Sequence, residues 1–330
     1  MKLLVTGSEG YVGYPLVLKL EKLGYDVIGV DNRSRGEWVH RITCGSEGLI
    51  RPETIVGNLT DRDFVDELLK LHKPNCIIHL ASQPSMPYSQ ISWERALFTQ
   101  LNNQIMNLNL LWGMKENNLL DTKYIVTTTT GVSGQNYSLV PEEMVTNFAG
   151  SWYHVSRGFD SENCNLAARQ WNLRIIEFRT AIVYGLLTEE LRESGLTSRF
   201  DTDYYFGTAL NRFVAQAIKG EPLSVYGDGR QTKPFISLED CVQSLANAVT
   251  FNFPKGHTLL NQTTESVSII HLAKLISQET GAEIKHIPNP RVEKEDFEMR
   301  FENSKFLRVL GEPKQLIGEG VKEIIGTLKC

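Results

Sequence analysis

The sequence predicts an α/β fold in which a doubly wound parallel sheet carries a second, smaller α/β lobe. Strand-length apolar runs alternate with longer amphipathic segments as far as residue 180, a glycine-rich turn directly follows the first run, and beyond residue 185 the alternation loosens. Short continuous apolar runs are typical of parallel strands, and their alternation with helices favours a sheet covered on both faces. We therefore expect the larger unit at 1–184 plus 236–257 and the lobe at 185–235 plus 258–330.

The first element is an apolar strand at 1–6, which runs into the turn Gly7-Ser8-Glu9-Gly10-Tyr11-Val12-Gly13. Glycines at these places allow a tight turn, a close approach of the backbone to a pyrophosphate and close packing of the following helix. The start of that helix offers free N–H groups and a partial positive charge. This order of strand, glycine turn and helix predicts a site for the phosphates of a dinucleotide.

A second strand at 25–30 ends at Asp31, at the spacing of about 20 residues that is typical of a dinucleotide site. The Asp31 carboxylate would accept hydrogen bonds from the adenosine ribose and repel a 2′-phosphate. We therefore predict a Rossmann-type domain that binds NAD in preference to NADP, a preference that Arg33 and Arg35 weaken slightly. The polar stretch from 31 to 54 predicts a surface loop at the adenosine end.

The remaining elements follow the same alternation. In chain order we predict a strand at 55–56, a helix from 60 to 71, a strand at 76–80, a helix at 93–118, a strand at 123–128, a helix from 151 to 171, a strand at 174–179, helices at 201–219 and 239–248, short strands at 224–226 and 235–237, and a terminal helix. His79 is predicted to be a core histidine inside its strand. Ligands bind at the carboxyl ends of parallel strands, so the predicted cofactor-binding residues follow strand ends. They are Gly7, Gly10, Tyr11, Val12, Gly13, Asp31, Asn32, Arg33, Asn58, Leu59, Leu80, Ala81 and Ser82.

The composition argues against several classes of protein. The 330 residues carry a net charge of -5 without a basic block, which argues against nucleic-acid binding. No apolar run is long enough to cross a bilayer and no cleavable signal begins the chain, so we expect a soluble cytoplasmic protein without a membrane partner. The 5 cysteines are scattered and lack C-x-x-C spacing, so neither a disulfide framework nor a metal site is predicted.

A second informative stretch opens the helix predicted from residue 151. Tyr153 and Arg157 are four residues apart and therefore share a helix face. A fixed cation beside a phenol favours its ionisation, which makes tyrosine a usable base at neutral pH. Without the nucleotide motif upstream, a solvated helix face would be the better interpretation of this pair. With that motif, we predict that both residues contact the cofactor and take part in catalysis.

These motifs resemble the extended short-chain dehydrogenases, which include the NAD-dependent epimerases and dehydratases, and among them the UDP-sulfoquinovose synthase branch. The resemblance covers most of the chain. It rests on the G-x-x-G-x-x-G spacing with Thr6 before it, and on longer runs further along. Those runs are Pro87-Tyr88-Ser89, Thr99-Gln100, Asn102-Asn103, Tyr153-His154-Val155-Ser156, Val183-Tyr184-Gly185, Phe206-Gly207-Thr208-Ala209-Leu210-Asn211-Arg212-Phe213, Val225-Tyr226-Gly227, Gln231-Thr232 and Asn289-Pro290-Arg291-Val292-Glu293.

The resemblance implies a transient oxidation at carbon 4 of a UDP-hexose, with NAD as the hydride acceptor. Thr129 would bond the 4-hydroxyl, Tyr153 would take its proton, and Arg157 would replace the family lysine. His154, with an ordinary pKa near ~6.5, would move the proton in an elimination, after which sulfite could add. A homodimer that pairs two long helices is also implied. The implied substrate-binding residues are Gln83, Tyr88, Thr129, Thr180, Asn211, Tyr226, Lys233 and Arg291.

Three departures from the synthase pattern leave other outcomes open. Val132 stands where the family has glutamate, Pro84 where it has an arginine beside Gln83, and Arg157 where it has lysine. The same oxidation could therefore serve a UDP-sugar 4-epimerase or a dehydratase. A nucleotide-sugar-binding protein without turnover is the alternative from another class. Product mass and NADH absorbance separate these possibilities.

Overall fold

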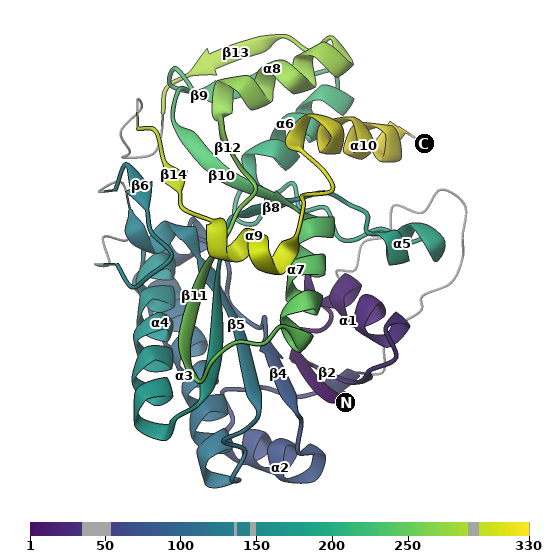
Figure 1. The fold of residues 1–330 in the computed structure, drawn as a ribbon. Coiled ribbons are helices and arrows are strands. Elements are labelled where there is room, and N and C mark those ends of the chain that lie inside the picture. Colours follow the sequence, from purple (N-terminus) through teal and green to yellow (C-terminus); the bar gives the residue numbers. More distant parts are fainter. Residues whose placement is uncertain (35–53, 135–136, 146–149, 290–296, 330) are drawn as a thin grey trace.

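The computed structural model describes residues 1–34, 54–134, 137–145, 150–289 and 297–329 (Figure 1). Its centre is a seven-stranded sheet in the order β11-β7-β5-β4-β1-β2-β3, in which every pairing is parallel. The strands are β1 (Lys2–Thr6), β2 (Asp26–Asp31), β3 (Thr54–Val56), β4 (Cys76–His79), β5 (Lys123–Thr129), β7 (Arg174–Thr180) and β11 (Gly256–Gln262). The chain adds strands to one side of β1 as far as β3 and then to its other side from β4 onwards, and such a switch point opens a ligand crevice. The predicted fold class is confirmed.

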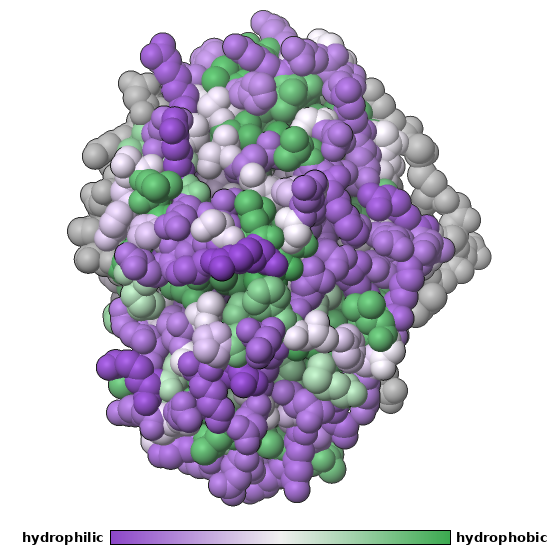
Figure 2. All heavy atoms as spheres, viewed as in Figure 1, coloured by the Kyte–Doolittle hydropathy of each residue, from purple (hydrophilic) through white to green (hydrophobic). Residues whose placement is uncertain are grey.

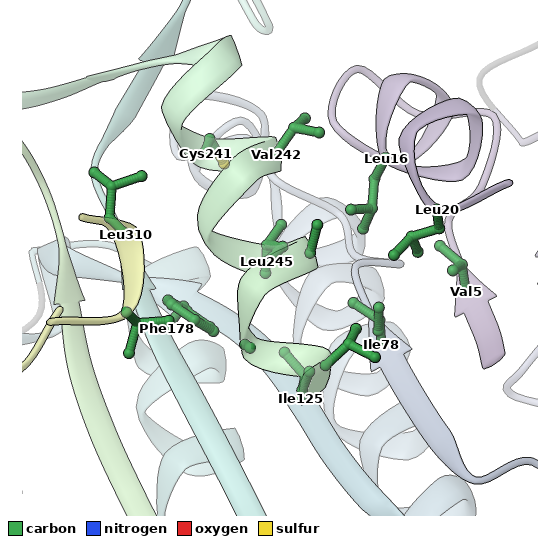
Figure 3. Close-up of a cluster of buried hydrophobic side chains, with 14 of the residues drawn as sticks. Val5, Leu16, Leu20, Ile78, Ile125, Phe178, Cys241, Val242, Leu245 and Leu310 are labelled. Atoms are coloured by element: carbon green, nitrogen blue, oxygen red, sulfur yellow. The ribbon is translucent and has the colours of Figure 1, made fainter. Parts of the chain in front are cut away.

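Helices cover both faces of this sheet because its strands alternate their side chains. Leu3 and Val5 point into one apolar cluster, whereas Leu4 points into the other. In Figure 3, Leu16 and Leu20 meet side chains of the strands on the first face. That face carries α1 (Gly13–Lys22), α5 (Glu189–Glu193), α7 (Leu238–Thr250) and α9 (Ser304–Leu310), and the second carries α2 (Arg62–His72), α3 (Trp93–Glu116) and α4 (Trp152–Trp171).

The smaller lobe lies above the carboxyl ends of the sheet strands and has an apolar core of its own (Figure 1). Two small sheets build it, one of order β12-β10-β8 and one of β13 beside β9. A further pair, β6 (Leu139–Val140) with β14 (Arg300–Phe301), lies beside it. The lobe elements are β8 (Ile182–Tyr184), α6 (Ala209–Ile218), β9 (Leu223–Tyr226), β10 (Thr232–Ser237), β12 (Glu265–Ser268), α8 (Ile269–Thr280), β13 (Ile284–Ile287) and α10 (Ile317–Lys329).

Two boundaries differ from the prediction. The helix expected from residue 201 begins only at Ala209, because the Asp203 side chain accepts hydrogen bonds from the backbone N–H groups of Tyr205 and Phe206 and holds a turn there. The expected lobe boundary after 257 falls inside β11, which pairs along its whole length with β7. β11 therefore belongs to the large sheet and not to the lobe.

The surface is mainly hydrophilic on the face that Figure 2 shows. Among the described residues, no helix is both long and apolar enough to pass through a bilayer. Three cysteines in the described part of the chain are buried thiols, as expected for small apolar fillers: Cys76, Cys164 and Cys241.

Lys123 is a buried cation that supports the end of α7. Its Nζ donates hydrogen bonds to the carbonyl oxygens of Ala248 (2.9 Å), Val249 (2.6 Å) and Phe251 (2.9 Å). The last carbonyls of a helix have no partner within the helix, so an ammonium from β5 ties α7 to the sheet. We predict that Lys123→Met lowers the free energy of unfolding by about 3 kcal/mol, measured by urea denaturation.

The matched control is Lys255→Met, because Lys255 makes a 2.9 Å ion pair with the exposed Asp121. That variant should leave the urea midpoint almost unchanged. An equal loss in both variants would contradict the role of Lys123 at the helix end.

Candidate active site

A cavity of about 1170 Å³ lies between the carboxyl ends of the sheet strands and the smaller lobe. This volume exceeds the range of about 300–1,000 Å³ that is usual for one small ligand, so it has room for a dinucleotide and a second molecule. The glycine turn after β1 lines one end. Thr129, Tyr153, His154 and Arg157 line its middle, and residues of the lobe line the other side.

The glycine turn brings bare backbone to the cavity. Gly7 has φ +72°, and a Cβ there would lie 2.8 Å from the backbone nitrogen of Ala81. A Cβ on Gly13 would overlap the carbonyl oxygen of Gly7. No side chain caps α1 at Val12, and the Tyr14 N–H donates to the Gly10 carbonyl (3.1 Å), so a ligand at this end would meet the N–H groups that precede Tyr14. This cradle fits a pyrophosphate, as the sequence predicted.

Asp31 ends β2 at the part of the cavity where the adenosine ribose is expected. Its carboxylate accepts hydrogen bonds from the backbone N–H groups of Glu9 (3.2 Å) and Arg33 (2.7 Å). Burial raises the pKa of Asp31, and these two hydrogen bonds partly offset that rise. Asn32, Arg33 and Leu59 also line this end, together with Leu80, Ala81 and Ser82 from the β4 side. The backbone N–H groups of Glu9 and Arg33 therefore fix the position of the Asp31 carboxylate.

Two of the predicted cofactor residues have other contacts. Asn58 is exposed, and its side-chain oxygen accepts a hydrogen bond from the Thr60 N–H (3.1 Å) instead of lining the cavity. Tyr11 lines the cavity, and its hydroxyl donates to the Gly185 carbonyl (2.6 Å), which ties the glycine turn to the lobe. The cofactor contact of Asn58 stays a prediction.

α4 presents the predicted catalytic residues to the cavity. Ser151 caps the helix by accepting a hydrogen bond from the His154 N–H (3.2 Å), and the Tyr153 N–H donates to Ser89 Oγ (3.1 Å). These two bonds fix the first turn of α4 against the segment before α3. As a result, Tyr153, His154 and Arg157 line the same cavity as Thr129 at the end of β5.

The Arg157 guanidinium is buried and held by two acceptors. Its Nη1 lies 2.7 Å from Asp160 Oδ2, and its Nη2 donates to the Thr127 carbonyl. The side chains of Arg157 and Asp160 are only 2% and 0% exposed. Among the described residues, Arg157 Nε has no hydrogen-bond partner. A buried donor without a partner is unfavourable, and an oxygen of a ligand in the cavity would satisfy it.

Tyr153 does not show the easily ionised phenol that the sequence predicted. Burial raises the pKa of Tyr153 and outweighs the lowering by Arg157 and by a hydrogen bond with Thr129. The Asp160 carboxylate adds to the rise because it offsets part of the charge of Arg157. The Tyr153–Arg157 pair is present, but the expected direction of the pKa shift was wrong because a sequence pattern carries no measure of burial.

His154 also departs from its expected pKa. Burial and the nearby charge of Lys233 lower the pKa of His154 to about 4. The imidazole is therefore neutral at pH 7 and able to accept a proton. Its ring fills the space beside Gly131, where a Cβ would overlap it.

The predicted substrate residues divide into three groups. Those that line the cavity are Thr129, Thr180, Asn211, Tyr226 and Lys233, whereas Arg291 lies outside the described residues. Two others lie behind the cavity wall.

Gln83 is buried and accepts a hydrogen bond from the Ser85 N–H (2.8 Å). Tyr88 packs against Phe98 and Phe206, and the Arg95 guanidinium lies 4.7 Å from its ring centroid. Both residues support the wall that carries Pro84 and Met86.

Several lining residues were missed by the sequence analysis. Arg199 makes a partly buried 2.6 Å ion pair with Asp201, and the Arg212 guanidinium lies 4.2 Å from the Tyr226 ring centroid. Tyr204 and Tyr205, which lie between Arg199 and Arg212 in the sequence, also line the cavity. An aromatic run flanked by arginines was the available signal, but a helix was predicted over part of it.

Comparisons with known proteins agree with this geometry. The family model described as "NAD dependent epimerase/dehydratase family" matches residues 3–259. The chloroplastic UDP-sulfoquinovose synthase of Spinacia oleracea is 33% identical over 98% of this chain and 74% of its own length. The UDP-sulfoquinovose synthase of Sulfolobus acidocaldarius is 33% identical over 99% of this chain and 92% of its own.

Among solved structures, the UDP-glucose 4-epimerase of Thermotoga maritima with UDP-glucose has the same fold. Its TM-score is 0.81 at 24% identity, over 100% of this chain and 99% of that one. The match over 3–259 and the two relatives that align along nearly the whole chain show that this protein belongs to the NAD-dependent epimerase/dehydratase family and is an NAD-dependent enzyme.

Proposed function

We propose that this enzyme transiently oxidises carbon 4 of a UDP-hexose. One observation carries the proposal: Thr129, Tyr153, His154 and Arg157 line one stretch of a cavity that extends from the glycine turn to the lobe. The two relatives at 33% identity are named as enzymes that form a UDP-sugar, which supports UDP-hexose as the substrate class.

The protein residues have defined tasks in this scheme. The glycine turn and the start of α1 would hold the pyrophosphate of NAD, Asp31 its adenosine ribose, and Arg157 Nε a ribose hydroxyl. NAD, when bound, accepts a hydride and later returns it. Thr129 and Tyr153 share a hydrogen bond, so a sugar hydroxyl placed between them could pass its proton to Tyr153. The Arg157 charge is needed because burial opposes ionisation of the phenol.

His154 is the proposed base for the next step. A ketone at carbon 4 acidifies the proton on carbon 5, and a neutral imidazole can remove that proton and pass it to the 6-hydroxyl, which leaves as water. Sulfite could then add at carbon 6 while a proton returns to carbon 5, and the carbon 4 ketone would take back the hydride to give a sulfoquinovose product. This outcome rests on the neutral state of His154 and on the similarity to the two synthases.

The second candidate is a 4-epimerase that uses the same oxidation. Pro84 favours it, because this residue lines the cavity where the synthases carry an arginine suited to an anionic donor, and proline bears no charge. Val132, which replaces a family glutamate, is buried and provides no carboxylate. An epimerase needs neither group, since it reduces the keto sugar on its other face.

A homodimer through α3 and α4 is also proposed. These helices pack side by side, and their exposed apolar residues recur at helical spacing on the outer surface. Those residues are Phe98, Leu101, Leu108 and Trp112 on α3, and Trp152, Phe159 and Leu166 on α4. Two copies would bury these stripes against each other as a four-helix bundle.

The function is tested by turnover of UDP-glucose with NAD, with and without sulfite. We expect slower turnover when carbon 4 of the sugar carries deuterium, because the hydride leaves from that carbon. Mass spectrometry separates the outcomes: a sulfonate replaces a hydroxyl in the synthase reaction, whereas epimerisation leaves the mass unchanged. Tyr153→Phe should slow either reaction by about 100-fold or more. NAD binding with no conversion of any UDP-sugar would instead identify a non-catalytic binding protein.

The pKa of His154 is tested by an NMR titration of its ring, assigned from the signal that His154→Gln removes. The lowered pKa predicts a neutral ring down to about pH 5, with protonation centred near about 4. Lys233→Met removes a cation that opposes protonation, so it should move the midpoint upwards. A midpoint near 6.5 in the unmodified enzyme would contradict the proposed neutral base.

The dimer is tested by sedimentation velocity. We expect twice the mass of one chain for the unmodified enzyme and a monomer for Leu101→Glu, because a carboxylate would be buried in the apolar contact. Leu316→Glu is the control, since Leu316 is also exposed but lies outside the stripes. A monomeric unmodified enzyme would overturn the proposal.

A further inference from the structure

We propose that Glu9 is a second determinant of the preference for NAD over NADP, acting by holding the Arg33 guanidinium away from a 2′-phosphate. This inference rests on the proposed placement of the adenosine ribose at Asp31. It does not depend on which sugar the enzyme uses.

Glu9 and Arg33 form a bidentate ion pair at the ribose end of the cavity. Arg33 Nη2 lies 2.7 Å from Glu9 Oε1, and Arg33 Nε lies 3.0 Å and 3.1 Å from the two carboxylate oxygens. Parallel N–H bonds of this kind hold a guanidinium in a defined orientation. The side chains are partly buried, with 35% of Arg33 and 15% of Glu9 exposed, and both residues line the cavity.

The backbone directs Arg33 into this contact. Arg33 has φ 53°, in the left-handed region that a residue other than glycine seldom adopts. Its N–H donates to Asp31, and the N–H of Glu9 donates to the other oxygen of the same carboxylate. The strand end and the glycine turn are therefore joined through Asp31, which brings the side chains of Glu9 and Arg33 together across 24 positions of sequence.

This arrangement works against a 2′-phosphate in two ways. NADP sites commonly place an arginine beside the 2′-phosphate, and Arg33 follows the ribose-binding acid closely enough to serve as one. Glu9 occupies that guanidinium and adds a second carboxylate next to Asp31. A 2′-phosphate there would be repelled by the carboxylates of Asp31 and Glu9, and Arg33 would already be paired with Glu9. The ribose hydroxyls of NAD need only a hydrogen-bond acceptor.

A simpler interpretation is an ion pair at the rim that only holds the turn together. Such a pair would affect both dinucleotides equally, because each places the same pyrophosphate on the turn. Selectivity for one dinucleotide is therefore the quantity that distinguishes the two interpretations.

The test is calorimetric titration of the purified enzyme with NAD and with NADP, without sugar. Glu9→Gln keeps the size of the side chain and removes its charge. We expect the Kd for NADP to fall about tenfold, which corresponds to about 1.4 kcal/mol, while the Kd for NAD changes less than about twofold. In Glu9→Gln/Arg33→Gln the gain for NADP should disappear, since the Arg33 charge that Glu9 no longer balances is what would attract the phosphate.

An unchanged Kd for NADP in Glu9→Gln would overturn the proposal, and so would an equal change for both dinucleotides. Thermal unfolding shows whether each variant is folded. If Glu9→Gln is not folded, Glu9→Ala is titrated in its place, and we again expect a lower Kd for NADP with little change for NAD. If the unmodified enzyme binds NAD but converts no UDP-sugar, the proposed function fails while this inference stands. If it binds neither dinucleotide, the placement of the ribose fails and the inference with it.

Discussion

The buried ion pair between Arg157 and Asp160 is the contact on which the geometry of the active site depends. Burying two charges is unfavourable unless they are paired closely and hydrogen-bonded further. Here the 2.7 Å contact is supplemented by a bond from Arg157 to the Thr127 carbonyl on β5. The ion pair lies within α4 and orients the guanidinium, and the bond to Thr127 ties α4 to the end of a central strand. Because Tyr153 lies one turn earlier on the same face, the same contact turns its phenol toward the cavity.

A second buried network holds α4 to the sheet below this pair. Glu177 on β7 accepts hydrogen bonds from Thr128 on β5 (2.5 Å), Ser161 on α4 (2.7 Å) and His257 on β11 (2.9 Å). Burial opposes ionisation of Glu177, but His257, Arg179 and Thr128 outweigh it and lower the pKa of Glu177 to about 2. Burial and the charge of Glu177 raise the pKa of Asp160 to about 7. One carboxylate is thus held ionised by hydrogen bonds, and the other depends on Arg157 for its charge.

The parts of the site that follow local patterns could be predicted from the sequence. The glycine turn, Asp31 and the Tyr153–Arg157 spacing each lie within one turn or one helix, and the structure places them as expected. The pKa directions of Tyr153 and His154 could not be predicted, because they arise from burial by distant elements. The same reason applies to the Glu9–Arg33 pair, which exists only once two strand ends meet, and to β11, whose pairing with β7 overrides a mixed local pattern.

The replacement of the family lysine by Arg157 is compatible with catalysis because a guanidinium has more donors than its structural contacts use. Lysine would offer one ammonium for both the phenol and the cofactor ribose. Arginine has three nitrogens, so some can make structural contacts while another is kept for a ligand. Nη1 donates to Asp160 and Nη2 donates to the Thr127 carbonyl. Nε has no partner among the described residues, and Arg157 lines the cavity. The larger side chain therefore keeps the charge beside Tyr153 and retains a donor for a ligand. The Asp160 carboxylate raises the pKa of the same phenol, so the charge of Arg157 also has to balance it.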